Sequence, residues 1–126
     1  MLNSDMQILA HIQRHCRRIS EMVERVGSNF VVFSEDVVFV DAVCLNILQI
    51  GELAHSLSSE YRKLTENEVP WKDIIGIRNI VAHHYGTIDV DRIWHSAISD
   101  VPALDEFCER QLSNSYVHGF NFDQQT

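Results

Sequence analysis

Apolar residues recur every three or four positions along most of the chain, which is the spacing of helices with one buried face. This pattern predicts a first helix over residues 4–26, which Gly27 ends, and a second helix over residues 34–57 with Ser34 as its N-cap. A shorter helical segment, SSEYRKL, follows and leads into the polar stretch TENEV. No stretch alternates polar and apolar residues for long enough to predict a strand.

The second half of the chain predicts further helices, which proline, glycine and aspartate separate. Pro70 opens a helix that ends at Gly86, and Asp89 caps the next one. Pro102 either kinks this last helix or begins a fifth segment after Asp100.

These helices predict one all-α domain, an up-and-down four-helix bundle over residues 1–112 with a short extra helix. Residues 113–126 show no period, and we expect them to form a loose C-terminal tail. The length of 126 residues allows a single hydrophobic core.

Composition and charge narrow the function classes only partly. The 45% hydrophobic and 22% charged residues are ordinary for a globular protein. The net charge of -8 argues against a general nucleic-acid coat, because non-specific binding to phosphates depends on many Lys and Arg contacts. It does not exclude an enzyme that handles RNA in one local cleft.

The cysteines and the apolar segments indicate a cellular compartment. Cys16, Cys44 and Cys108 are odd in number and far apart, which favours buried thiols in a reducing cytoplasm over disulfides or a zinc site. The N-terminus lacks the basic start and apolar run of a signal peptide. The most apolar span, residues 37–57, is interrupted by polar side chains and is interpreted as a buried bundle helix, not a membrane span. We therefore expect a cytoplasmic protein without a membrane contact.

The stretch RNIVAHHYG, residues 78–86, places several groups that are costly to bury inside an isoleucine-rich segment. The apolar side of this helix on a helical wheel is predicted to hold Ile74, Ile77, Ile80, Val81 and His84. The opposite, polar side is predicted to hold Lys72, Gly76, Arg78, Asn79, Ala82 and His83. Asn79 and His83 are one turn apart, so the amide could orient the imidazole.

The two histidines are therefore expected to differ in role. His84 falls with the isoleucines and is interpreted as a core or interface histidine. His83 falls beside Arg78, although a solvated surface histidine would show the same pattern. Tyr85 lies at the predicted helix end as an accessible phenol, which a partner enzyme could modify.

Arg78, His83 and Tyr85 form the pattern R-x4-H-x-Y, flanked by LQIGELA, PWKDIIGIRN, YGTID and IWHSAISDVPAL. With these flanks the chain resembles the HEPN superfamily, specifically the HepT-like toxins that pair with a minimal nucleotidyltransferase antitoxin. The resemblance covers about residues 9–112. His84 stands where many members carry Gly or Glu, and the tail has no counterpart in the family.

The resemblance implies a toxin of a toxin–antitoxin pair, a metal-independent endoribonuclease that works as a homodimer with two motifs facing one cleft. It implies catalytic roles for Arg78, Asn79 and His83, RNA as the substrate, and no cofactor. It further implies that the antitoxin silences the toxin by transferring AMP to Tyr85.

The implied chemistry is physically reasonable. RNA cleavage without a metal needs a base for the 2′-hydroxyl, an acid for the leaving oxygen and a cation for the developing phosphorane charge. Histidine can take either proton role, and the arginine fork fits phosphate oxygens. Because one motif supplies a single histidine, a two-fold dimer would supply both the acid and the base.

Other polar residues on the first two predicted helices are weaker candidates. Arg14, Arg17, Arg18 and Arg25 cluster on the first helix, and their pattern favours a solvated face paired with nearby glutamates over an RNA or antitoxin contact. His11 and His15 have the spacing of a metal pair, but no carboxylate completes a site. Glu52, in IGE, either supports the Arg78 side of the cleft or packs between helices.

Two competing functions remain open at this point. One is a non-catalytic helical module that docks a nucleotidyltransferase. The other is a metal-dependent nucleotide pyrophosphohydrolase, which needs an E-x-x-E type cluster on facing helices, whereas the acids of this chain are scattered.

Overall fold

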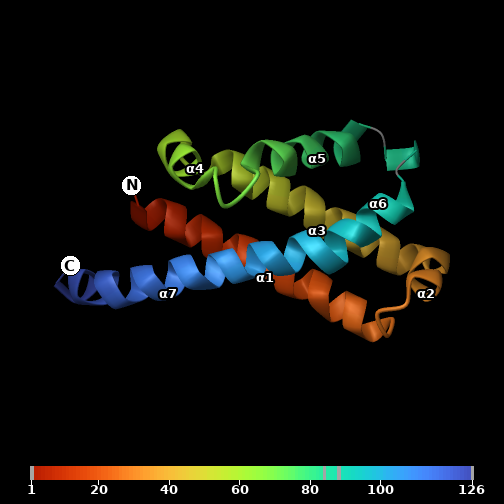
Figure 1. Ribbon diagram of the computed structural model, residues 1–126, viewed down its shortest axis with the longest axis horizontal. Coiled ribbons are helices and arrows are strands. Elements are labelled where there is room, and N and C mark those ends of the chain that lie inside the picture. The colour runs from red at the N-terminus through yellow and green to blue at the C-terminus, as the bar shows by residue number, and fades with distance from the viewer. Residues whose placement is uncertain (1, 84, 88, 126) are drawn as a thin grey trace.

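The computed structural model describes residues 2–83, 85–87 and 89–125, with side chains for residues 4–83, 86–87 and 89–114. Four long helices build the fold, and Figure 1 shows them as an elongated bundle with both chain ends at the same end. They are α1 (Leu2–Arg25), α3 (Val37–Ser56), α5 (Trp71–His83) and α7 (Val101–Gln125). The described residues contain no strand, so the predicted all-α bundle is confirmed.

Short elements connect the long helices. They are α2 (Phe30–Glu35), α4 (Ser59–Thr65), the 3-10 turn η1 (Tyr85–Thr87), α6 (Val90–His95) and the π-helical turn η2 (Ser96–Asp100). The segment SSEYRKL thus forms the predicted extra helix, α4, and Asp89 caps α6 as expected by accepting from the backbone N–H of Asp91.

The predicted stop of the first helix at Gly27 is confirmed. Gly27 has a φ of +64°, a conformation that costs glycine little. Its N–H donates to the carbonyl of Glu24, and the N–H of Ser28 donates to the carbonyl of Val23. This pair of bonds is a Schellman motif, which satisfies the last carbonyl groups of α1.

The predicted N-cap at Ser34 is wrong. Ser34 lies inside α2, whose N-cap is Asn29. Asp36 is in extended conformation, ends α2, and caps α3 by accepting from the backbone N–H groups of Val38 and Phe39. Serine and aspartate are both favourable N-cap residues, and here Asp36, two residues after Ser34, occupies the N-cap position of α3.

The expectation that a further segment begins after Asp100 is confirmed, because α7 begins at Val101, one residue before Pro102. The turn before it widens to the π form, in which the N–H of Val101 donates to the carbonyl of Ser96. A proline clashes with the carbonyl four residues earlier and cannot donate to it, and the π turn accommodates this locally. α6, η2 and α7 thus follow one another without a loop.

The expected loose arm after Leu112 is helical, because α7 continues to Gln125. Residues 113–125 contain no proline, and extending an existing helix costs little compared with starting one. No break in secondary structure marks the predicted domain boundary at Leu112, and the separate tail stays a prediction.

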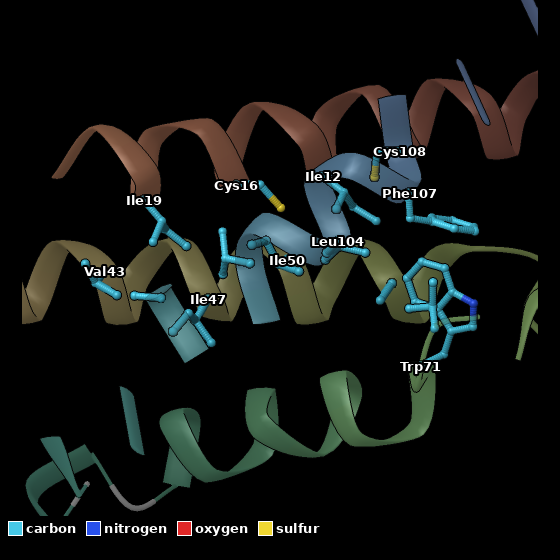
Figure 2. Packing of buried hydrophobic residues seen from close by; sticks show 14 of the residues in the cluster. Ile12, Cys16, Ile19, Val43, Ile47, Ile50, Trp71, Leu104, Phe107 and Cys108 are labelled. Carbon is cyan, nitrogen blue, oxygen red and sulfur yellow. The ribbon is translucent and has the colours of Figure 1, made fainter. Parts of the chain in front are cut away.

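The hydrophobic core lies between α1, α3 and α7 (Figure 2). Its labelled members include Ile12, Cys16 and Ile19 of α1, Val43, Ile47 and Ile50 of α3, and Leu104, Phe107 and Cys108 of α7. Trp71 at the start of α5 meets Phe107 edge to face, with ring centroids 5.9 Å apart. This aromatic contact joins the start of α5 to the core.

The three cysteines are free and buried, as expected from their spacing. Burial raises the pKa of Cys44 to about 11 and that of Cys108 to about 12, and it raises the pKa of Cys16 as well. Because the thiolate is the reactive form, these thiols are poor nucleophiles at neutral pH.

α5 packs along α3, on the side of α3 away from the α1 interface. Between α5 and α7 lies a groove of about 670 Å³, whose floor includes Ile47 and Ile50 of α3, Ile77 of α5 and Leu104 of α7. The bundle is therefore open on this side, and α5 is held mainly from the α3 side.

α3 is long and apolar enough to cross a membrane by length and composition, with a mean hydropathy of 1.8. In this fold it packs between α1 and α5 as a bundle helix. The expectation that it is buried holds only in part, because 39% of its most apolar window is buried and Val37, Val38 and Leu45 are exposed.

Candidate active site

Arg78 lies against the backbone of α3 at Gly51. A Cβ added to Gly51 would overlap with the Cβ of Arg78 and would lie 3.3 Å from its Cα. The missing side chain at Gly51 thus lets α5 approach α3 closely at this point. Gly51 is buried, and the Arg78 side chain is only 21% exposed.

The predicted helical wheel of α5 is therefore only partly correct. Val81 is buried and His83 is exposed as expected, but Arg78 faces α3 and Ile80 is exposed. Trp71 and Val81 are the buried residues of α5, and Arg78 packs on Gly51 of α3. Arg78 faces the bundle because its apolar stem packs over a glycine, and long basic side chains can bury such stems while the charged end stays in contact with solvent. Ile77 and Ile80 instead line the groove toward α7.

Three polar contacts hold the guanidinium of Arg78. Its Nη1 lies 3.5 Å from Oε1 of Glu52 on α3. Its Nε and Nη2 donate to Oδ1 of Asn79, at 3.3 Å and 3.0 Å. The contact expected between Glu52 and Arg78 is thus present, and the arginine still has N–H groups for an anion, since a guanidinium carries five of them.

Asn79 orients Arg78, and its carbonyl oxygen is not available to His83 in the way the one-turn spacing suggested. His83 is exposed and is the last residue of α5. His83 follows Arg78 by five residues, which places the two side chains about 140° apart around the axis of α5. Within one chain, Arg78 and His83 therefore point in different directions.

Two sequence-predicted residues cannot be placed fully. His84 lies outside the described residues. Tyr85 begins η1, but its side chain lies outside the described part of the chain, so its relation to Arg78 stays a prediction.

The family model of the HepT-like ribonucleases matches residues 12–111, which include all four long helices in whole or in part. The chain belongs to the HepT-like ribonuclease family. The matched region contains the α3–α5 contact around Arg78 and excludes the end of α7.

Individual relatives agree with this family. The HepT-like chain is 32% identical over 98 residues to a protein named "Putative RNase" in Caldanaerobacter subterraneus subsp. tengcongensis, covering 78% of this chain and 85% of the relative. It is 25% identical over 95 residues to the "Probable ribonuclease HepT" of Thermococcus cleftensis, covering 68% and 82%. No solved structure matches the chain.

The arginines of α1 in this HepT-like protein are partly paired. Arg17 binds Asp105 and Glu109 of α7, at 3.5 Å and 3.1 Å, and Arg25 binds Glu21, at 2.8 Å. The predicted pairing with nearby glutamates of the same helix thus holds for Arg25, whereas Arg17 is paired with acids of α7. α1 also packs on α3 and α7, away from the α5 motif.

His15, one of the two histidines with metal-pair spacing, contacts α3. Its Nδ1 lies 2.8 Å from Oδ1 of Asn46, whose amide donates to the carbonyl of Ala42. Within the described ranges, no three His, Cys, Asp or Glu side chains gather in a group that could hold a metal ion.

Gly51 was not among the site residues predicted from the sequence of this HepT-like protein. Its signal was present, because a glycine in the middle of an apolar helix indicates close approach of another backbone or side chain. What approaches it, the stem of Arg78, is a property of the packed bundle.

Proposed function

We propose that this HepT-like protein is the toxin of a toxin–antitoxin pair and cuts RNA as a metal-independent endoribonuclease. The observation that carries the proposal is the placement of Arg78, held by Gly51, Glu52 and Asn79 at the edge between α3 and α5 with donors left for a phosphate. Membership of a ribonuclease family supports RNA as the substrate.

In the proposed reaction a histidine removes the proton of a ribose 2′-hydroxyl, whose oxygen attacks the adjacent phosphorus. The bond from phosphorus to the 5′-oxygen breaks, and a second histidine protonates that leaving oxygen. Arg78 stabilises the charge on the non-bridging oxygens, a role that suits a planar cation with paired donors. His83 is the residue proposed for both proton transfers, one from each of two chains.

The two-fold requirement makes a homodimer part of the proposal. Val38, Leu45 and Glu52 are seven residues apart on α3, so they fall on nearly one stripe of the helix. Val38 is 71% exposed and Leu45 is 57% exposed. We call these three residues the α3 stripe. Glu52, which belongs to the stripe, contacts Arg78. If two copies paired along the α3 stripe, the two R-x4-H motifs would therefore lie at one cleft.

Leu45→Glu is expected to prevent dimerisation, because the interface would have to bury an unpaired carboxylate. Light scattering should give a mass near 14.5 kDa for this variant and twice that value for the unchanged protein. Leu64→Glu is the matched control, since Leu64 is 75% exposed on α4, away from the stripe. A monomeric unchanged protein, or a dimeric Leu45→Glu variant, would refute this interface.

The proposed regulation is transfer of AMP from ATP to the hydroxyl of Tyr85 by a nucleotidyltransferase antitoxin, with pyrophosphate released. The tyrosine lies two residues after His83, so the added phosphate and adenosine would compete with RNA close to the motif.

The test of the proposed function is cleavage of RNA by the purified protein in excess EDTA. We expect cleavage to persist in EDTA, and to stop if the protein has first been incubated with the partner, ATP and Mg²⁺. Tyr85→Phe should cut equally well and remain active after the same incubation, because it lacks the acceptor oxygen.

Loss of cleavage in EDTA that Mg²⁺ restores would refute metal independence. ATP-dependent silencing of Tyr85→Phe would place the modification elsewhere. An unchanged protein that binds the nucleotidyltransferase but cuts no RNA would favour the docking module over the nuclease.

A further inference from the structure

A second pocket, of about 620 Å³, lies where the end of α3, the helix α4 and the start of α5 meet. Its charged lining is mostly basic and consists of Arg62, Lys63, Lys72 and one acid, Glu66. His55 adds a further group that can donate a hydrogen bond. In a protein with a net charge of -8, such a local excess of cations is notable because the average surface is acidic.

Among the described residues, the basic groups of this pocket form no ion pair with an acidic side chain. Within the part of the chain that the structure describes, the arginines found in ion pairs are Arg17, Arg25, Arg78 and Arg110. Arg62 is half-buried, and its Nε is buried without a hydrogen-bond partner. An unsatisfied buried donor is costly, and an anion in the pocket would supply an acceptor beside Arg62, which lines it.

α4 is fixed from its other side, so the pocket has a rigid wall. Asp5, which is buried, accepts from the backbone N–H and the hydroxyl of Ser58, the N-cap of α4, at 2.8 Å and 2.7 Å. The hydroxyl of Tyr61 donates to Gln111 of α7. Trp71 donates to the hydroxyl of Thr65, which is buried at the end of α4.

The pocket lies on the same side of the α3–α5 edge as the motif. His55, which lines the pocket, follows Glu52 by three residues on α3, and Ile75, which also lines it, precedes Arg78 by three residues on α5. Residues three apart in a helix are neighbours on its surface. Lys72 precedes Arg78 by about 9 Å along the axis of α5, a distance within reach of a neighbouring phosphate of the same strand.

We propose that this basic pocket is an accessory phosphate site, which holds the backbone of single-stranded RNA next to the phosphate that is cut at Arg78. The proposal rests on the proposed ribonuclease function. It adds a second phosphate contact, so the RNA must be long enough to reach from Arg78 to the basic pocket. A charged groove that follows the backbone of a single strand binds without reading the bases.

The experiment measures binding and cleavage separately in three proteins: the unchanged protein, Lys63→Gln/Lys72→Gln, and Arg14→Gln/Arg18→Gln. Both lysines are exposed, so their removal should leave the melting temperature unchanged. The arginine pair is the matched control, because it removes two exposed charges from α1 on the far side of α3. The binding probe is a single-stranded oligoribonucleotide with every 2′-hydroxyl methylated, which cannot be cut.

We expect Lys63→Gln/Lys72→Gln to bind the methylated strand about tenfold more weakly at low salt. The slope of log affinity against log salt should fall by about 1.4, since each phosphate contact to a single strand contributes about 0.7. With unmodified RNA the KM should rise and kcat should stay nearly constant. The arginine control should change each quantity much less.

Equal losses in both variants, or no loss in the lysine variant, would overturn the accessory site. A further outcome would also overturn it: ATP displaces the methylated strand from the unchanged protein, and this displacement is lost in Lys63→Gln/Lys72→Gln. The pocket would then bind a free nucleotide. An unchanged protein that fails to bind the strand overturns the site as well. If it binds the strand with the expected lysine dependence but cuts no RNA, the nuclease proposal fails and the phosphate site stands.

Discussion

His83→Ala is expected to lower the rate of RNA cleavage by about 10²–10⁴-fold, because a positioned acid or base contributes about that much. In the proposed dimer the substitution removes the acid and the base together, so the loss should lie at the upper end. The melting temperature should hardly change, since His83 is exposed at the end of α5.

The measurement is single-turnover cleavage of RNA together with thermal unfolding of both proteins. His11→Ala is the control, because His11 is also an exposed histidine on a long helix but lies on α1. Cleavage by His83→Ala at the unchanged rate would mean that the motif histidine moves no proton and that other residues carry out the cleavage, which would refute the proposed mechanism. A large loss of stability would instead mean that the imidazole has a structural partner.

Gly51→Ala is expected to destabilise the protein by about 1–3 kcal/mol, the usual cost of forcing extra volume into a packed interface. The added methyl group would overlap with Arg78 at its Cβ, which moves only with the backbone of α5. α5 would therefore shift away from α3 and carry the guanidinium with it. Since a displacement of about 1 Å can cost about 10²-fold in rate, cleavage should fall by more than stability alone explains.

Gly76→Ala provides a sharp control for this steric argument. A Cβ at Gly76 would meet nothing within 4 Å, and the residue lies in the same helix as Arg78. This substitution should be neutral or should stabilise by up to about 1 kcal/mol, because alanine favours helix more than glycine does. Denaturant unfolding and cleavage rates of the two variants can be compared directly. Equal effects would show that helix propensity, not the contact with Arg78, determines the result.

Local signals along the chain predicted the helices well. Gly27 and Asp89 act through their own backbone and side chain within a few residues, so the sequence contains all that determines those helix ends. Ser34 and Asp36 show the limit of such signals. Both residue types are good N-caps and they lie two positions apart, and in the structure Asp36 caps α3.

The composition of the candidate site was predictable, but its geometry was not. The motif residues stand out because polar groups interrupt an apolar helix. The direction of Arg78, however, depends on Gly51, which is 27 residues away in sequence and forms the surface on which the arginine lies. A helical wheel places large apolar residues inward and cannot register a glycine on the neighbouring helix.

The basic pocket was missed for the same reason. Arg62 and Lys63 belong to a short helix that the sequence predicted only coarsely, and Lys72 belongs to the next one. Arg62, Lys63 and Lys72 line one pocket only because the folded chain packs α4 beside the start of α5.

The open side of the bundle also affects how the motif helix can move. α5 contacts α3 along one side and faces a groove toward α7 on the other, whereas α1 is packed between two long helices. Segments with fewer buried contacts detach at a lower free energy than the whole domain needs to unfold. The helix that carries Arg78 and His83 is thus the one that a bound partner can tilt or lift with the least work, while the core of α1, α3 and α7 stays intact.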